Sequence, residues 1–208
     1  MAAIDEFKHR TISNASKGDF RDRGSKFLAF AHSITSSTDV KDIINALKKE
    51  HPKAVHYCYA YRIGTDGLQF RANDDGEPSG SAGKPILGQI DSLGFTNVLV
   101  VVVRYFGGTL LGVPGLINAY KTATYQALSS ASVIEKWEEV LFEINFDYPS
   151  MGEVLYLLKQ CESTIYQQDM QLFCVVKAGI PKPFAIQYEK KLSEIAGVTI
   201  KVQEMQKV

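Results

Sequence analysis

Apolar residues occur along this chain in runs whose period changes, and each period predicts a type of secondary structure. The segment 97–106 is apolar at nearly every position up to Arg104, which is typical of a central strand covered on two faces. A helical repeat follows at 116–127, and its small residues permit close packing on a sheet. The end of the central strand is therefore the place where we expect function.

The rest of the first 134 residues predicts further strands and two more helices. Apolar and polar residues alternate at 26–34, 54–63 and 68–72, which indicates strands. A hairpin turn is predicted at 64–67. One amphipathic helix is capped by Thr38, and another begins near Lys84. Residues 1–24 predict one strand and a turn, without a recognisable function.

The composition changes after Ser132, and 133–138 is predicted to be a linker. Strand, helix, two strands, helix and strand then follow, at 140–146, 151–158, 164–168, 171–177, 184–195 and 198–203. This βαββαβ order is the ferredoxin-like arrangement. Its outward sheet face has mixed charge and no aromatic ladder, which favours a protein-contact or regulatory role over RNA binding. We expect two domains in an α+β protein, residues 1–134 and 135–208.

Two glycine-rich loops lead from apolar strands into helices, at 76–85 (GEPSGSAGKP) and 106–115 (FGGTLLGVPG). Backbone N–H groups at such turns lie at the positive end of a helix dipole and favour an anion. Lys84 and Arg104 would add positive charge. We therefore predict that the two loops meet and form one anion-accepting groove.

The established nucleotide motifs do not match these loops. A Walker A loop ending at Lys84 needs a glycine where this chain has Pro78 and a serine or threonine where it has Pro85. Tight turns and close packing of helices on the sheet explain the glycines equally well. Both interpretations stay open from the sequence.

Three carboxylates, Asp74, Asp75 and Glu77, follow the strand at 68–72. They have the chemistry to bind a divalent cation or to act as acid and base, although turn and capping chemistry is the simpler interpretation for Asp74 and Asp75. Glu77 would repel an anion in the groove. We therefore predict that Glu77 pairs with Arg104 or helps to hold a cation; the alternative is that Arg104 only tethers the loop.

The strand at 54–63 places tyrosines 57, 59 and 61 on one face and His56 and Cys58 on the other. The tyrosines could stack on bases, but burial against a helix is the simpler interpretation. His56 and Cys58 could be a base and its thiol. Side chains two residues apart on a strand are about 7 Å apart, so a packed cysteine is favoured.

Three stretches resemble the YigZ/IMPACT family: HYCYAYRIG, DDGEPSGSAGKPIL and VVVVRYFGGTLLGVPGLINAY, within about residues 25–131. The resemblance implies an IMPACT-type α/β sandwich, a ribosomal-protein domain-2-like sheet with helices on one face. It also implies a ferredoxin-like second domain, as in bacterial members. Eukaryotic relatives act in translational control by binding a regulator of an initiation-factor kinase. This chain has Leu110 and Asn118 where many relatives have Lys and Arg.

Composition narrows the functional class. Lys plus Arg equals Asp plus Glu at 23 each, so no bulk charge attracts the chain to nucleic acid or membrane. The three cysteines show no metal-binding spacing and are expected to be reduced structural thiols, and we predict neither metal nor cofactor. The sequence shows neither a signal-peptide core nor a membrane-length apolar run, so a cytoplasmic location is expected.

Two functions follow. The favoured one is a non-enzymatic binding or regulatory protein linked to translation control, which docks a protein or structured RNA, including the ribosome, through the glycine-rich 74–120 surface. The alternative is a hydrolase-like enzyme acting on a small anionic or phosphorylated substrate, with Glu77 as general base and Arg104 as charge clamp. The candidate binding residues are His56, Cys58, Asp74, Asp75, Glu77, Ser79, Ser81, Lys84, Arg104, Tyr105, Gly107, Gly108, Gly112 and Tyr120. Oligomeric state is not indicated by the sequence.

Overall fold

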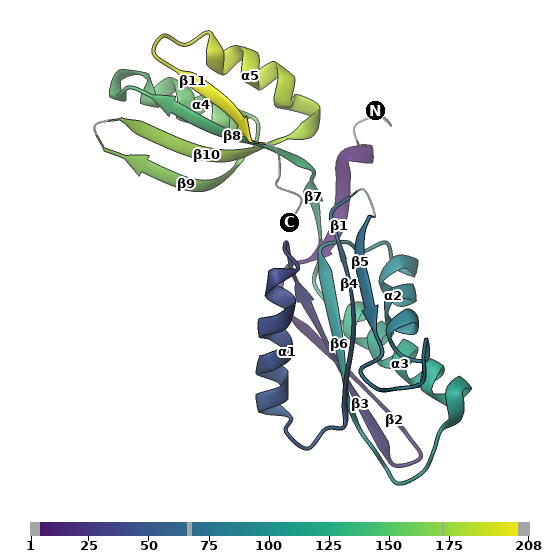
Figure 1. Ribbon diagram of the computed structural model, residues 1–208. Helices are drawn as coiled ribbons and strands as arrows, with labels where there is room; N and C mark the ends of the chain where they lie inside the picture. The colour runs from purple at the N-terminus through teal and green to yellow at the C-terminus, as the bar shows by residue number, and fades with distance from the viewer. Residues whose placement is uncertain (1–4, 66–67, 172, 204–208) are drawn as a thin grey trace. The chain divides into compact units, whose positions relative to one another are not determined.

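The computed structural model describes residues 5–65, 68–171 and 173–203 (Figure 1). Their contacts divide the chain into two compact units, one at 9–136 and one that joins 137–203 to 5–8. The segment predicted to be a linker is instead a strand, β7 (Val133–Trp137), which pairs with β1 (Lys8–Ile12) in a two-stranded sheet. Independent folding of two domains stays a prediction.

The first unit is built on a five-stranded antiparallel sheet with β6 (Val98–Tyr105) at its centre. The strand order is β2-β3-β6-β4-β5, with the bounds Ser16–Asp22, Ser25–Ser33, Val98–Tyr105, His56–Ile63 and Gln69–Asn73. The prediction of a central strand covered on two faces is confirmed, because the side chains from Val98 to Val103 are fully buried. The N-terminal region forms two strands, β1 and β2, where one was predicted.

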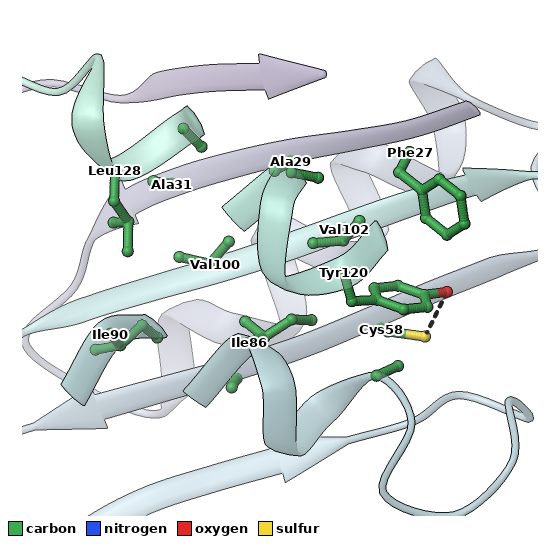
Figure 2. Close-up of a cluster of buried hydrophobic side chains, with 14 of the residues drawn as sticks. Phe27, Ala29, Ala31, Cys58, Ile86, Ile90, Val100, Val102, Tyr120 and Leu128 are labelled. Carbon is green, nitrogen blue, oxygen red and sulfur yellow. Dashed lines mark hydrogen bonds between the residues drawn. The ribbon is translucent and has the colours of Figure 1, made fainter. Parts of the chain in front are cut away.

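Helices cover both faces of this sheet, which corrects the expectation of helices on one face (Figure 1). Helices α2 (Gly83–Ser92) and α3 (Gly112–Ser129) bury one face, and Figure 2 shows part of that core. Helix α1 (Thr38–Glu50) packs on the opposite face. Helix α3 begins four residues earlier than predicted, because a proline fits the first turn, where its missing N–H has no helical partner.

The second unit confirms the ferredoxin-like order βαββαβ. Its elements are β8 (Glu139–Phe146), α4 (Met151–Gln160), β9 (Thr164–Met170), β10 (Cys174–Pro181), α5 (Ala185–Ser193) and β11 (Thr199–Gln203). The antiparallel sheet has the order β11-β8-β10-β9 and packs one face against α4 and α5. Strand β10 starts later than predicted and runs on to Pro181, because Ala178 and Ile180 continue its inward apolar series.

Further sequence expectations concern features outside these sheets. The pairing of β4 with β5 is present, although residues 66 and 67 of the predicted hairpin turn lie outside the described residues. Among the described residues, no helix is long and apolar enough to cross a bilayer. Within the same ranges, no cluster of three or more His, Cys, Asp or Glu side chains is arranged to hold a metal ion.

Candidate functional site

Three strands bring distant residues into one row at the end of the central strand. In the antiparallel register, Phe27 on β3 and His56 on β4 both lie directly opposite Arg104 on β6. Neighbouring residues in such a row share a face of the sheet, here the face covered by α2 and α3. The row therefore offers a cation, an imidazole and an aromatic ring to whatever packs above it.

Glu77 packs above this row and receives two hydrogen bonds on one carboxylate oxygen. Arg104 Nη1 donates to Glu77 Oε1 over 2.6 Å, and the Tyr120 hydroxyl of α3 donates to the same atom over 2.7 Å. The side chains of Glu77 and Arg104 are 3% and 6% exposed. The predicted ion pair between Glu77 and Arg104 is thus confirmed, and it is buried.

Aromatic rings complete the surroundings of the Arg104 guanidinium. Its central carbon lies 5.3 Å from the Phe27 ring centre and 5.7 Å from that of Phe106. Phe27 also meets Tyr120 edge to face, with centroids 5.1 Å apart. Arg104 Nε is buried without a hydrogen-bond partner among the described residues, so the rings supply the remaining favourable contacts of this cation.

Cys58 and His56 each bond to the loop that carries Glu77. Cys58 Sγ lies 3.0 Å from the Asp74 carbonyl oxygen. It also lies 3.3 Å from the Tyr120 hydroxyl, the contact shown in Figure 2. Burial raises the pKa of the Cys58 thiol, so the thiol stays protonated at neutral pH. His56 Nδ1 lies 2.7 Å from the Asp75 carbonyl, and its Nε2 is 4.0 Å from Glu77 Oε1. All three cysteines are free and buried, which confirms that they are packed.

The Asp74 carboxylate occupies the N-terminus of α2, where the anion was expected. Its two oxygens accept hydrogen bonds from the backbone N–H groups of Gly80, Ala82 and Gly83 at 2.9, 3.0 and 2.8 Å. Burial alone would raise the pKa of Asp74, but these three donors and the charge of Lys84 lower it below the usual value. Asp74 is therefore a capping residue.

Asp75 also bonds to the backbone. Its Oδ2 accepts from the Tyr57 N–H of β4 at 2.6 Å, and its own N–H donates to the Asn73 side chain. Capping is confirmed for Asp74, whereas the Asp75 carboxylate joins the loop to β4. The carboxylates of Asp74 and Asp75 thus fix the loop 74–82 through hydrogen bonds to backbone N–H groups.

The second glycine-rich segment is arranged differently. The Gly107 N–H donates to Ser25 Oγ at 3.1 Å, and a Cβ on Gly107 would lie 1.9 Å from the backbone of Gly24. Gly107 therefore serves close packing against the β2–β3 turn. Four apolar side chains around this segment are exposed: Phe106 48%, Leu110 82%, Val113 47% and Ile117 38%. We call them the apolar patch.

Phe27, His56, Cys58, Glu77, Arg104 and Tyr120 form what we call the Glu77 cluster. The remaining predicted site residues lie outside it or act in turns. Tyr105 points to the other face, where its hydroxyl lies 2.9 Å from His51 Nδ1. Ser81 is buried and donates to the Pro78 carbonyl, whereas Ser79 and Lys84 are exposed. Gly108 has a φ of 86° in the turn, and Gly112 begins α3.

Sequence reasoning missed Phe27, which packs against both Arg104 and Tyr120. Its position opposite Arg104 follows from the register between β3 and β6. Alternation along the strand at 26–34 could have shown its face, but the sequence does not specify which strand lies beside β6.

Comparison with known proteins agrees with these motifs. A family model described as the Impact N-terminal domain matches residues 23–128. IMPACT family member YigZ of Escherichia coli is 32% identical over 174 residues, which is 83% of this chain and 85% of that protein. IMPACT family member YvyE of Bacillus subtilis is 32% identical, with 73% of this chain and 70% of that protein covered.

More distant and structural likenesses point the same way. Human Protein IMPACT is 38% identical over 96 residues, 44% of this chain and 29% of that protein. A crystal structure of a hypothetical protein superposes with a TM-score of 0.73 at 28% identity, over 96% of this chain and 98% of that one. The chain belongs to the IMPACT family.

Proposed function

We propose that this protein is a non-enzymatic binding and regulatory protein linked to translation control, and that it docks a protein partner through the 74–120 surface. The observation that carries the proposal is the apolar patch defined above. Phe106, Leu110, Val113 and Ile117 lie within twelve residues of one another, and Val113 and Ile117 are one turn apart on α3. Grouped apolar side chains on a soluble surface are typical of protein-interaction sites.

The composition of this patch favours a protein over RNA. RNA recognition relies on cations at the phosphates and on stacked aromatic rings. In this chain the patch contributes one aromatic ring, Phe106, and Leu110 is its most exposed member. Arg104, which lies against the Phe106 ring, is buried and paired with Glu77. A partner with apolar anchors matches these contacts better than a phosphate backbone.

The buried cluster gives the patch a rigid base. The Arg104 guanidinium lies against the Phe106 ring and is hydrogen-bonded to the Glu77 carboxylate. A fixed backbone lowers the entropy lost when a surface binds. Within this proposal the Glu77, Arg104 and Tyr120 contacts position the docking surface and do no chemistry. The link to translation is an extension from the family's eukaryotic members.

The hydrolase-like alternative has less support. A general base must reach the substrate proton, whereas Glu77 Oε1 is shared by Arg104 and Tyr120 and the side chain is 3% exposed. A nucleophilic thiol requires a lowered pKa, whereas burial raises the pKa of Cys58.

The test is site-specific photo-crosslinking in a lysate that is translating. A photoreactive residue at Leu110 should crosslink to a protein of the translation machinery. Ile186 in the second unit is the matched control, because its side chain is 84% exposed against 82% for Leu110. Crosslinks from Leu110 to ribosomal RNA, or the same products from both sites, would contradict the proposal.

A double substitution provides a second readout. Leu110→Lys with Val113→Lys should abolish the specific crosslinked product formed from a photoreactive residue at Ile117. The fold should be unchanged, because both side chains are exposed. Ile186→Lys should leave the product intact. Retention of the product in the double variant would show that the patch is not the docking surface.

A further inference from the structure

An open cavity of about 390 Å³ lies between helix α1 and the strands β4 and β5, on the sheet face opposite α2 and α3. This volume is within the range of roughly 300–1,000 Å³ that is typical of small-molecule sites. Its lining residues are Ser37, Val40, Lys41, Ile44, Asn45, Lys48, Tyr59, Tyr61 and Arg71. The residues of the Glu77 cluster and of the apolar patch are not among them.

The lining comes from two regular elements that face each other. The α1 residues recur at helical spacing from Ser37 to Lys48, so they form one stripe along the helix. On the sheet, Tyr61 of β4 lies directly opposite Arg71 of β5, so both side chains share a face. The site is therefore built on a helix and a strand pair, the elements that hold side chains most precisely.

The charge of the lining has one sign. Lys41, Lys48 and Arg71 carry positive charges, and none of the nine lining residues is acidic. The α1 acids Asp39 and Asp42 are exposed and lie outside the lining. Converging cations in a cavity favour an anion, and the planar fork of arginine suits a phosphate group.

The walls of the cavity include two tyrosines in addition to the cations. Tyr59 and Tyr61 pack against the core on the α1 side, as the simpler interpretation of the tyrosine strand predicted, and they also line the cavity. Both are only partly buried, which leaves part of each side chain facing the cavity. A flat heterocyclic ring binds well against such surfaces, because stacking on an aromatic ring favours any base. Val40 and Ile44 add apolar wall opposite the tyrosines.

We propose that this cavity binds a mononucleotide, with the base against Tyr59 and Tyr61 and the phosphates at Lys41, Lys48 and Arg71. Asn45 and Ser37 provide hydrogen-bonding groups for its sugar and base edges. The inference is independent of the docking surface, which belongs to the other side of the first unit.

The test is calorimetric titration of the full chain with ATP and AMP at low salt. ATP should bind with one site per chain. Arg71→Gln and Lys41→Gln should each weaken ATP binding about tenfold or more, the scale of a lost charge-assisted contact. Lys49→Gln is the matched control, because it removes the same charge from an exposed position of α1 outside the lining. Its effect should stay within about twofold.

Tyr61→Leu distinguishes a nucleotide from a simple phosphate. It should weaken ATP but leave inorganic triphosphate unaffected, with circular dichroism confirming that each variant is folded. Four results would overturn the proposal: no binding of ATP or AMP to the native chain, equal weakening by Lys49→Gln, unchanged binding in Arg71→Gln, or triphosphate binding as tightly as ATP. Binding of an oligonucleotide without any mononucleotide would also overturn it, in favour of single-stranded RNA.

Discussion

The glycine-rich loop 76–85, with the two aspartates that precede it, and the glycine-rich segment 106–115 have similar compositions but opposite roles in the structure. In the first, carboxylates of Asp74, Asp75 and Glu77 turn inward and bind backbone groups, Arg104 and Tyr120. In the second, Gly107 packs closely against Gly24, and the side chains of Phe106, Leu110 and Val113 turn outward. Glycine content therefore reports the path of the chain and says little about what the loop presents. The side chains between the glycines decide that.

The largest effect on stability is expected at the buried ion pair of Glu77 and Arg104, which fixes the first segment. Arg104→Ala should lower the free energy of unfolding by about 3–5 kcal/mol, because it leaves the Glu77 carboxylate buried without its cation. Urea denaturation followed by circular dichroism measures the change. A double variant, Glu77→Gln with Arg104→Met, should recover part of the loss because no buried charge remains.

An exposed ion pair of similar length is the control for this substitution. Lys182 Nζ lies 2.9 Å from Glu138 Oε1, and its side chain is 45% exposed. Lys182→Ala should cost less than about 1 kcal/mol, as is usual for surface pairs. If Arg104→Ala costs no more than this, the ion pair does not lock the loop.

Substitutions at two neighbouring leucines test the contrast between buried and exposed side chains inside the second segment. Leu111 is 8% exposed and belongs to the core of the first unit, whereas Leu110 is 82% exposed. Leu111→Ala should lower the free energy of unfolding by about 2–3 kcal/mol, the lower part of the range for core leucines. Leu110→Ala should change it by less than about 0.5 kcal/mol. Equal losses at both positions would mean that the patch packs in solution and is not a free surface.

A smaller effect is expected at the cap of α2. Asp74→Asn should lower the free energy of unfolding by about 1–2 kcal/mol at neutral pH, because the neutral amide keeps one acceptor oxygen for three N–H donors that the carboxylate satisfies with two. The native pKa of Asp74 is lowered, so its contribution is present above the unfolded pKa of about 4 and is lost as pH falls through the native value. The difference between native and variant should therefore narrow below pH 4. Asp42→Asn, on the exposed side of α1, is the control.

The sequence predicted most of the fold because its signals are local and repeated. The run at 97–106 and the βαββαβ order needed only periodicity. The predicted fold class holds, although α1 covers the sheet face that was expected to lack helices. That face was not predictable, because one amphipathic stripe does not reveal which face of a sheet a helix covers. The strand at Val133–Trp137 was missed since its partner, β1, lies more than one hundred residues away.

The candidate site was only partly predictable for the same reason. The pairing of Glu77 with Arg104 followed from the repulsion that Glu77 would exert on an anion in the predicted groove. The places of Phe27 and His56 beside Arg104 required the strand order. The cavity under α1 required three elements at once, and its Lys41, Lys48 and Arg71 had no motif to mark them.

The smallest expected effect is the stabilisation of the protein by phosphate at the anion groove that was predicted from both glycine loops. In the structure the Asp74 carboxylate already accepts from the N–H groups of Ala82 and Gly83, and the Gly107 N–H is bonded to Ser25. A phosphate ion must therefore displace the Asp74 carboxylate to reach the N–H groups at the start of α2. Phosphate at a concentration equal to its Kd stabilises a protein by about 0.4 kcal/mol, and we expect less than this at about 50 mM phosphate.

The measurement should be made in Arg71→Gln, so that the cavity under α1 contributes little, and against chloride at equal ionic strength, since exposed charges are screened by salt. Asp74→Ala in the same background frees the three amides of Gly80, Ala82 and Gly83 and should raise the phosphate effect above that of its parent, even though the variant is less stable overall. Stabilisation of the parent by more than about 1.4 kcal/mol, which corresponds to phosphate near tenfold above its Kd, would show that the Asp74 carboxylate yields to phosphate. The first loop would then be a ligand site like that predicted from its glycines, and the contrast between the two segments would fail.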